Sequence, residues 1–398
     1  MELLAPAGTL EKLKWAVIYG ADAVYFGTEF GSLRNFAGNF TFDDAAAGLD
    51  FLHSRGKKGY VTLNIYPFSD EYDRIINTAG ALDDMGADAF IVSDLGVFMA
   101  LKKSGLRAPL HISTQANTTS WQAVLAYKEL GAKRVNLARE LSLDRIKEIQ
   151  AKTREIIETE VFIHGAVCFS YSGRCAISDY LTGHRANRGE CKHPCRWRYF
   201  LMEETRPGKY MPVFEDERGL YLFNSKDLAL FEFVPGLKEA GVSSIKIEGR
   251  MKTIHYIATV VSFYRQVLDG KRFSIEEGLK LLGRMPNRGF STGFMKGSIR
   301  PDDYDFNMAD KIFATILVGD VTEEKINGKC VVRVRNTILA GETLETLSPD
   351  GTTSTIAMPP RIAVTDGNMV ECANNSQHIL LEQELCPYTI IRRVNTHY

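Results

Sequence analysis

The chain has 398 residues, of which 45% are hydrophobic and 24% charged, and its formal net charge is −1. This length exceeds the usual range of a single domain and predicts one large domain with a smaller one. The near-zero charge excludes a protein that is basic overall, so any contact with RNA must come from a local patch. The apolar runs are too short to span a membrane, and the first residues lack the basic segment of a secretory signal. We therefore expect a cytoplasmic protein without membrane attachment.

A short junction that recurs along the chain predicts buried parallel strands. It is a glycine followed by an apolar run, and it occurs at 19–27, 85–94, 130–140 and 240–250. Glycine takes the left-handed conformation that ends a helix, and apolar residues at consecutive positions are typical of a parallel strand buried on both faces. Further apolar runs of similar length lie between these junctions, at 2–7, 59–64, 109–114 and 160–166.

Eight strands that alternate with amphipathic segments predict a closed (β/α)8 TIM-like barrel over residues 1–300. An open, doubly wound sheet is the alternative, although no G-x-G-x-x-G motif follows the first strand. We expect the barrel's last helix at 253–270, another helix at 273–285 and a glycine-rich linker at 286–298. From 305 to 398 short alternating strands predict a small antiparallel β-barrel domain that binds RNA or a partner.

Polar residues follow the predicted strands, and in such a barrel the active site lies at the carboxyl ends of the strands. The candidate catalytic residues at these positions are Gln115, Arg139, Glu140, His164, Glu248 and Arg250. Arginine side chains at the mouth suit a carboxylate-bearing small molecule. The alternative is that Glu140 and Glu248 pair with these cations for a structural purpose.

Four of the seven cysteines lie in one insertion, about 167–240, that follows the seventh strand and in which we also expect a helix near 226–239. They are Cys168, Cys175, Cys191 and Cys195. Four thiolates are the ligand set of a structural zinc or of an iron–sulfur cluster such as 4Fe-4S. Zinc sites usually use two close pairs, and here only Cys191 and Cys195 are close in sequence, so the spacing favours an iron–sulfur cluster. The alternative is that these cysteines are small buried side chains.

Basic and aromatic residues surround the last two of these cysteines. They are Arg185, Arg188, Lys192, Arg196, Trp197 and Arg198. Basic side chains neutralise phosphates and aromatic rings stack on unpaired bases, so this arm predicts a surface for single-stranded RNA. The alternative is a solvated basic loop. The motifs of common hydrolases are absent from the sequence, which lowers the expectation of a peptidase without excluding one.

The run EVFIHGAVC (160–168), continued by GRCAIS (173–178), resembles the signature of peptidase family U32, the collagenase-like peptidases. Three further segments at 2–8, 20–27 and 245–252 are also similar to that family, as is FNSKDL (223–228). The resemblance covers roughly residues 1–300. The C-terminal module is similar to the translation-factor-like barrel that some members carry.

The resemblance implies more than one activity. Besides peptidases, the family includes proteins implied to be oxygen-independent hydroxylases of tRNA uridine, of rRNA cytidine or of quinone rings. The resemblance implies that Cys168 and Cys175 are ligands of a cluster. Some relatives take a ligand after the N-S-K-D run, where this chain has Leu228 and Ala229, so Cys191 and Cys195 are left as the other pair.

The activity expected from this resemblance is hydroxylation of tRNA to 5-hydroxyuridine at the wobble position. An iron–sulfur cluster and a prephenate-like oxygen donor are implied, with Arg139 and Arg250 positioning the anionic donor. The alternatives are a U32-type protease and hydroxylation of rRNA cytidine or of a quinone ring.

Overall fold

The computed structural model describes residues 1–33, 39–168, 170–171, 174–175, 177–194, 200–202, 210–212, 214–216, 219–221, 226–298 and 314–395. The chain divides into two compact units. The first is Met1–Val17, Ala21–Lys252 and Arg288–Asp310, and the second is Ile18–Gly20, Thr253–Asn287 and Lys311–Tyr398. In the described part of the chain, no helix combines the length and the apolar character that crossing a membrane requires.

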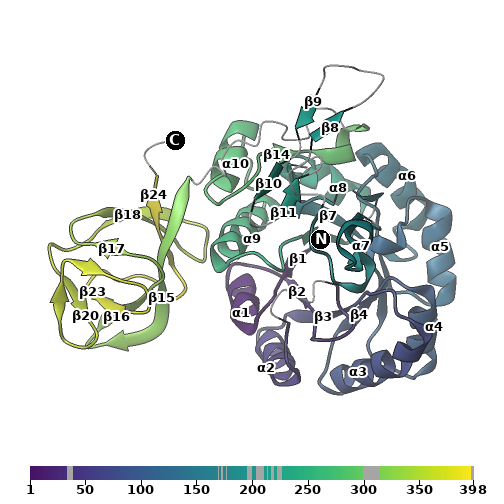
Figure 1. Ribbon diagram of the computed structural model, residues 1–398, viewed down its shortest axis with the longest axis horizontal. Coiled ribbons are helices and arrows are strands. Elements are labelled where there is room, and N and C mark those ends of the chain that lie inside the picture. Colours follow the sequence, from purple (N-terminus) through teal and green to yellow (C-terminus); the bar gives the residue numbers. More distant parts are fainter. Residues whose placement is uncertain are drawn as a thin grey trace. The chain divides into compact units, whose positions relative to one another are not determined.

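The first unit contains a closed barrel of eight parallel strands (Figure 1). They are β1 (Glu2–Pro6), β2 (Ala23–Phe26), β3 (Lys58–Leu63), β4 (Ala89–Val92), β5 (Leu110–Ile112), β6 (Arg134–Asn136), β7 (Glu158–Ala166) and β13 (Ser244–Ile247). The barrel closes because β13 pairs in parallel with both β1 and β7. The eight predicted strands are thereby confirmed, and the open doubly wound sheet is excluded.

Helices follow the strands in alternation, as predicted. Those of the first unit are α1 (Leu10–Ile18, whose last residue belongs to the second unit), α2 (Phe42–His53), α3 (Tyr72–Asp84), α4 (Leu95–Lys103), α5 (Trp121–Leu130), α6 (Leu143–Thr153) and α8 (Val234–Ala240). Short 3-10 turns occur at η1 (Ser69–Glu71) and η2 (Thr114–Ala116).

The glycine and the aspartate of the repeated junction each have a structural role. Gly86, Gly131 and Gly241 follow helices with φ of 91°, 101° and 93°, a region that L side chains rarely adopt. In two of the junctions the aspartate two residues after the glycine accepts a hydrogen bond from the preceding strand. Asp22 Oδ2 accepts from the Leu3 N–H at 3.0 Å, and Asp88 Oδ2 accepts from the Gly59 N–H at 2.7 Å. The motif therefore ends a helix and aligns two strands at once.

The insertion between β7 and β13 contains short elements. They are α7 (Ile177–Thr182), η4 (Ala186–Arg188), β8 (Phe200–Met202), β9 (Tyr210–Pro212), β10 (Phe214–Asp216), β11 (Gly219–Tyr221), β12 (Asp227–Ala229) and η5 (Phe231–Phe233). The helix expected near 226–239 begins only at Val234, because β12 pairs antiparallel with the end of β7. The expected linker 286–298 is also partly ordered, since β14 (Phe290–Ser291) pairs with β12 and is followed by η6 (Gly293–Lys296).

The second unit combines α9 (Ile254–Leu268) and α10 (Ile275–Leu282) with an antiparallel sheet. The sheet was predicted for the C-terminal region, whereas α9 was expected as the last helix of the barrel and instead groups with this unit. Its strands are β15 (Thr315–Ile326), β16 (Lys329–Val334), β17 (Ile338–Leu339), β18 (Thr343–Leu347), β19 (Thr353–Ala357), β20 (Ile362–Val364), β21 (Met369–Val370), β22 (Cys372–Ala373), β23 (His378–Leu381) and β24 (Ile390–Val394). Valine, isoleucine and leucine side chains form its core, including Val318, Val332 and Ile391.

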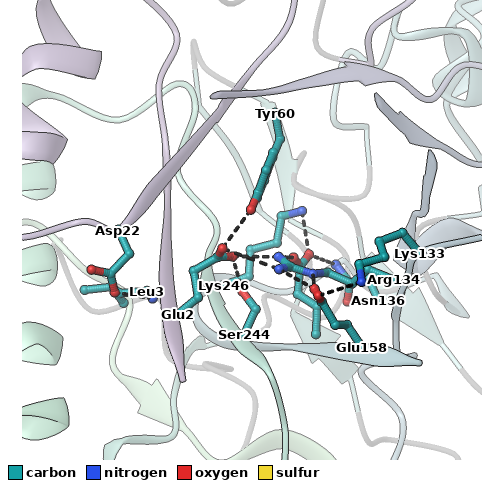
Figure 2. Close-up of polar contacts among 11 residues, drawn as sticks. Glu2, Leu3, Asp22, Tyr60, Lys133, Arg134, Asn136, Glu158, Ser244 and Lys246 are labelled. Atoms are coloured by element: carbon teal, nitrogen blue, oxygen red, sulfur yellow. Dashed lines mark hydrogen bonds and ion pairs between the residues drawn. The ribbon is translucent and has the colours of Figure 1, made fainter. Parts of the chain in front are cut away.

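A buried ion network occupies the amino-terminal end of the barrel (Figure 2). The Arg134 guanidinium lies 2.6 Å from Glu2, 2.7 Å from Glu158 and 3.4 Å from Glu160. Lys246 Nζ also contacts Glu160, at 2.9 Å. Neutral groups that hydrogen-bond the same carboxylates are Tyr60, Asn136 and Ser244. Because this end of a TIM barrel serves stability and the other end carries chemistry, the network defines the floor below the candidate site.

Candidate functional site

Three polar residues from neighbouring strand ends meet at the barrel mouth. The Gln115 side-chain oxygen accepts hydrogen bonds from Asn64 Nδ2 at 3.2 Å and from Ser93 Oγ at 3.3 Å. The backbone carbonyl of Gln115 accepts from the Tyr66 hydroxyl at 2.8 Å and from Arg174 Nε at 3.0 Å. Gln115 therefore connects the strand ends with the start of the cysteine-bearing insertion.

Arg250, which follows β13, is only 4% exposed and lies at the same end of the barrel. Its guanidinium donates to Ser32 Oγ, to the Leu33 carbonyl at 2.9 Å, to Thr62 Oγ1 at 3.2 Å and to Asn39 Oδ1 at 2.8 Å. These four acceptors are neutral oxygens that fix the orientation of the buried guanidinium. A guanidinium group can bind a carboxylate through two parallel hydrogen bonds.

Arg139 and Glu140, which follow β6, are both half-buried. Arg139 Nη1 donates to the Ala166 carbonyl at 3.3 Å, and its guanidinium carbon lies 5.4 Å from the centre of the Phe162 ring. Burial, and then the negative charge of Glu140, raise the pKa of Tyr171. Arg139 is therefore attached to the end of β7, directly before the first cysteine of the insertion.

Glu248 is held at the mouth by a tyrosine from β2. The Tyr25 hydroxyl lies 3.1 Å from Glu248 Oε2 and 3.0 Å from the Ile247 carbonyl. The Glu248 N–H donates to the His164 carbonyl at 2.8 Å, which links β13 to β7. The carboxylate is half-buried, and its orientation is set from two strands.

His164 in β7 is 1% exposed, and burial lowers its pKa to about 3. The nearby Asp227 carboxylate acts in the opposite direction, and Lys252 lowers the pKa further. The His164 ring packs against the Phe290 ring, with 5.9 Å between the ring centroids. The imidazole is consequently neutral at pH 7 and carries a proton on only one of its two ring nitrogens.

Three of the four clustered cysteines lie among the described residues, and Cys195 lies outside them. Cys168, Cys175 and Cys191 are partly buried. Cys175 Sγ accepts a hydrogen bond from the Ile177 N–H at 3.3 Å, and Cys191 Sγ accepts one from the His193 N–H at 3.4 Å. Amide donors directed at sulfur stabilise a thiolate and tune an iron–sulfur cluster.

The amide hydrogen bonds to the sulfurs of Cys175 and Cys191 thus suit a metal centre, but the described residues do not contain an assembled ligand set. Over the described ranges, no three histidine, cysteine, aspartate or glutamate side chains come close enough together to hold a metal ion. Cys195, the predicted fourth ligand, lies beyond these ranges. The four-cysteine site therefore stays a prediction.

The basic arm is described only in part, because Arg196, Trp197 and Arg198 lie outside the described residues. Arg188 forms a two-pronged ion pair with Glu71, at 2.5 and 2.8 Å, and hydrogen bonding from Arg188 lowers the pKa of Glu71. Arg185 is exposed, and the Lys192 N–H donates to Ser178 Oγ at 3.3 Å. Arg188 therefore ties the arm to the loop that follows β3.

Several residues of the mouth were not singled out from the sequence. Arg174 contacts the Tyr66 hydroxyl and the Gln115 backbone, and Thr62 and Ser32 bind Arg250. Arg174 carried a usable signal, since it directly precedes Cys175 in the signature run. Ser32 and Thr62 carried none, because their role depends on a partner more than 180 residues away in sequence.

The fold and the residues at the barrel mouth define a TIM-like barrel protein. Its cysteine-bearing insertion lies at the end of the barrel where the strands terminate. The chain belongs to peptidase family U32: the family's sequence model matches residues 8–303, and the model of the U32 C-terminal domain matches residues 315–392.

Named relatives point to more than one activity. The chain is 36% identical to tRNA hydroxylation protein P of Escherichia coli, over 88% of this chain and 86% of that protein. It is 37% identical to tRNA hydroxylation protein P1 of Bacillus subtilis, over 98% of this chain and 94% of that protein. It is also 31% identical to a protein named Collagenase from Porphyromonas gingivalis, over 74% of this chain and 73% of that protein.

Proposed function

We propose that this protein is an RNA-hydroxylating enzyme that forms 5-hydroxyuridine at the wobble position of tRNA. Two relatives that align with most of the chain are named tRNA hydroxylation proteins, which supports tRNA as the substrate. The structural observation that carries the proposal is the buried Arg250 guanidinium at the same barrel end as the start of the cysteine-bearing insertion. A buried guanidinium near the start of the cysteine-bearing insertion supports a reaction that uses an anionic co-substrate together with a redox group.

The reaction divides the work between the chain and its small-molecule partners. Replacing a pyrimidine C–H bond by C–OH removes two electrons from the base, and protein side chains alone do not accept them. An iron–sulfur cluster held by Cys168, Cys175, Cys191 and Cys195 would supply electron transfer. A prephenate-like anion would supply the oxygen and would be the net acceptor of the two electrons, since replacing its C–O bond by C–H reduces it by two electrons. The protein's own part is to bind this carboxylate, through Arg250 and Arg139, and to exclude water from the mouth.

Nucleoside analysis of tRNA tests the activity. We expect 5-hydroxyuridine and its derivatives to disappear from the tRNA of cells that lack this gene and to return when the intact gene is restored. An unchanged nucleoside profile in the deletion strain would refute the proposal.

Metal content tests the cofactor separately. Protein purified without oxygen is expected to contain stoichiometric iron and acid-labile sulfide, and Cys175→Ala is expected to lose both. Cys372→Ala is the matched control, because Cys372 is also partly buried but lies in the C-terminal sheet. Zinc, or a metal content that Cys175→Ala leaves unchanged, would contradict an iron–sulfur site.

A peptidase is the second candidate, because one relative is named Collagenase. A peptidase predicts cleavage of denatured collagen by metal-free protein, at a rate that Cys168→Ala does not change. Absence of cleavage, together with loss of 5-hydroxyuridine in the deletion strain, would exclude it.

A further inference from the structure

The loop that follows β3 presents an exposed phenylalanine between two arginines. Phe68 is 52% exposed, although most phenylalanine side chains are buried. The guanidinium carbon of Arg188 lies 4.2 Å from the centre of its ring, and that of Arg185 lies 5.2 Å away. Both arginines come from the cysteine-bearing insertion, so two segments far apart in sequence build one surface.

This surface is held in place by a set of polar contacts. The Glu71 carboxylate accepts a hydrogen bond from the Phe68 N–H at 2.7 Å and also pairs with Arg188. Arg188 donates to the Tyr66 carbonyl at 3.3 Å, and the Tyr66 N–H donates to the Asn187 carbonyl at 3.1 Å. The ring of Phe68 is therefore positioned before any ligand arrives, which reduces the entropy lost on binding.

A second pair of the same kind lies beside it. The Arg174 guanidinium carbon is 5.4 Å from the centre of the Tyr66 ring, and Arg174 is exposed. Both Tyr66 and Arg174 donate to the carbonyl of Gln115, a candidate catalytic residue. The half-buried Tyr66 ring and the exposed Phe68 ring thus lie on the loop after β3, and each has a guanidinium group of the insertion beside it.

We propose that Phe68 and Arg185 form a stacking platform for an unpaired RNA base next to the nucleotide that enters the barrel mouth. This inference rests on the proposed function, since it identifies how the same site holds its RNA. Unpaired bases stack on aromatic rings and on guanidinium planes, and this is how proteins commonly bind single-stranded RNA. The assignment adds the loop after β3 to the RNA surface and gives Arg188 the role of a support.

The charged residues around Phe68 determine how RNA binding should depend on salt concentration. Glu71 pairs with Arg188, and Glu190 Oε2 accepts a hydrogen bond from the Arg185 backbone at 3.2 Å. These acids offset part of the positive charge, so stacking and not phosphate neutralisation is the platform's main contribution. Loss of the Phe68 ring should therefore weaken binding equally at all salt concentrations, whereas loss of a phosphate contact changes the salt dependence.

The test measures the affinity of Phe68→Leu, Phe68→Trp and the intact protein for an unmodified tRNA transcript, by fluorescence anisotropy at several salt concentrations. We expect Phe68→Leu to bind about tenfold more weakly, equivalent to about 1.4 kcal/mol, with an unchanged salt slope. Phe68→Trp should bind like the intact protein because it keeps an aromatic face. The matched control is Phe42→Leu, since Phe42 is 45% exposed at the start of α2.

Equal affinity of Phe68→Leu and the intact protein would overturn the inference, as would an equal loss in Phe42→Leu. Measuring 5-hydroxyuridine in the tRNA of cells that carry the intact gene or Phe68→Leu separates the two proposals. Ring-dependent binding without any product leaves the platform standing and refutes the proposed reaction. Product formation that Phe68→Leu leaves unchanged, with unchanged binding, refutes only the platform.

Discussion

At the end of β7 the His164 imidazole is enclosed by protein, and its pKa of about 3 is far below the usual value of 6.5. His111 in β5 is also buried, and burial lowers its pKa well below 6.5, with the positive charges of Arg134 and Lys246 acting in the same direction. In the unfolded chain both residues regain ordinary pKa values. Protons therefore bind the unfolded state more strongly than the folded state in mildly acidic solution.

This difference predicts a pH-dependent stability. The free energy of unfolding should be insensitive to the two histidines above pH 6.5 and should fall as the pH drops below it. For His164 alone the loss is about 2 kcal/mol by about pH 5, because each unit of pKa difference corresponds to about 1.4 kcal/mol. Urea unfolding at a series of pH values measures this loss, and His164→Gln should reduce it. An identical pH profile in that variant would show that His164 is accessible to protons.

The ion pair between Arg188 and Glu71 predicts an energetic coupling between the insertion and the loop after β3. Both side chains are about one-fifth exposed, and the pair is two-pronged. A double-mutant cycle with Glu71→Gln and Arg188→Gln should give a coupling energy of about 1 kcal/mol. A coupling near zero would mean that the arm is held by other contacts.

At the scale of elements, the sequence predicted the barrel strands because each has a local signal. A glycine ends the preceding helix, as Gly86 and Gly131 do, and an apolar run follows. The proximity of Asn64, Ser93 and Gln115 could also be predicted from the sequence, because the ends of the strands converge in a barrel.

Other elements carry no local signal. The strand β12 has only three residues and depends on its partner β7, so the sequence around it was interpreted as a helix. The floor network joins Glu2 to Arg134 across 132 residues of sequence. Neither contact can be derived from a spacing rule, because each exists only once the barrel has closed.

The floor network also gives a prediction. Arg134→Met should lower the free energy of unfolding by about 3–5 kcal/mol, because it removes the buried cation that Glu2, Glu158 and Glu160 share. Lys246 would still pair with Glu160 and the exposed Lys133 with Glu158. Lys133→Met is the control, since Lys133 pairs with Glu158 at 3.5 Å from an exposed position and should matter little. Equal losses in thermal melting of the two variants would contradict a stabilising role for the buried arginine.

For the whole molecule, the second unit joins segments from different regions of the chain. Arg392 in β24 is fully buried, and its Nε lies 2.6 Å from Glu345, which also pairs with Arg284 at 2.9 Å. Thr315 Oγ1 donates to the Arg284 carbonyl. The core of this unit therefore includes the segment 253–287 as well as the C-terminal strands.

This arrangement predicts how fragments behave. A fragment 253–398 should be more stable to heat than a fragment 314–398, because the shorter one leaves Glu345 without Arg284. In the longer fragment, Arg284→Met should lower the melting temperature towards that of the shorter fragment. Equal melting temperatures for the two fragments would show that the C-terminal strands form their core without 253–287.

The pairing of β12 with β7 has a consequence for how the protein family can change. Ala166, where the chain leaves the barrel, is the direct pairing partner of Asp227, where the chain returns. The sixty residues between them form a loop with adjoining ends, and lengthening such a loop adds little entropic penalty. Material can be added, removed or exchanged there without shifting the register of any barrel strand. The barrel scaffold can therefore be kept while this single module is exchanged.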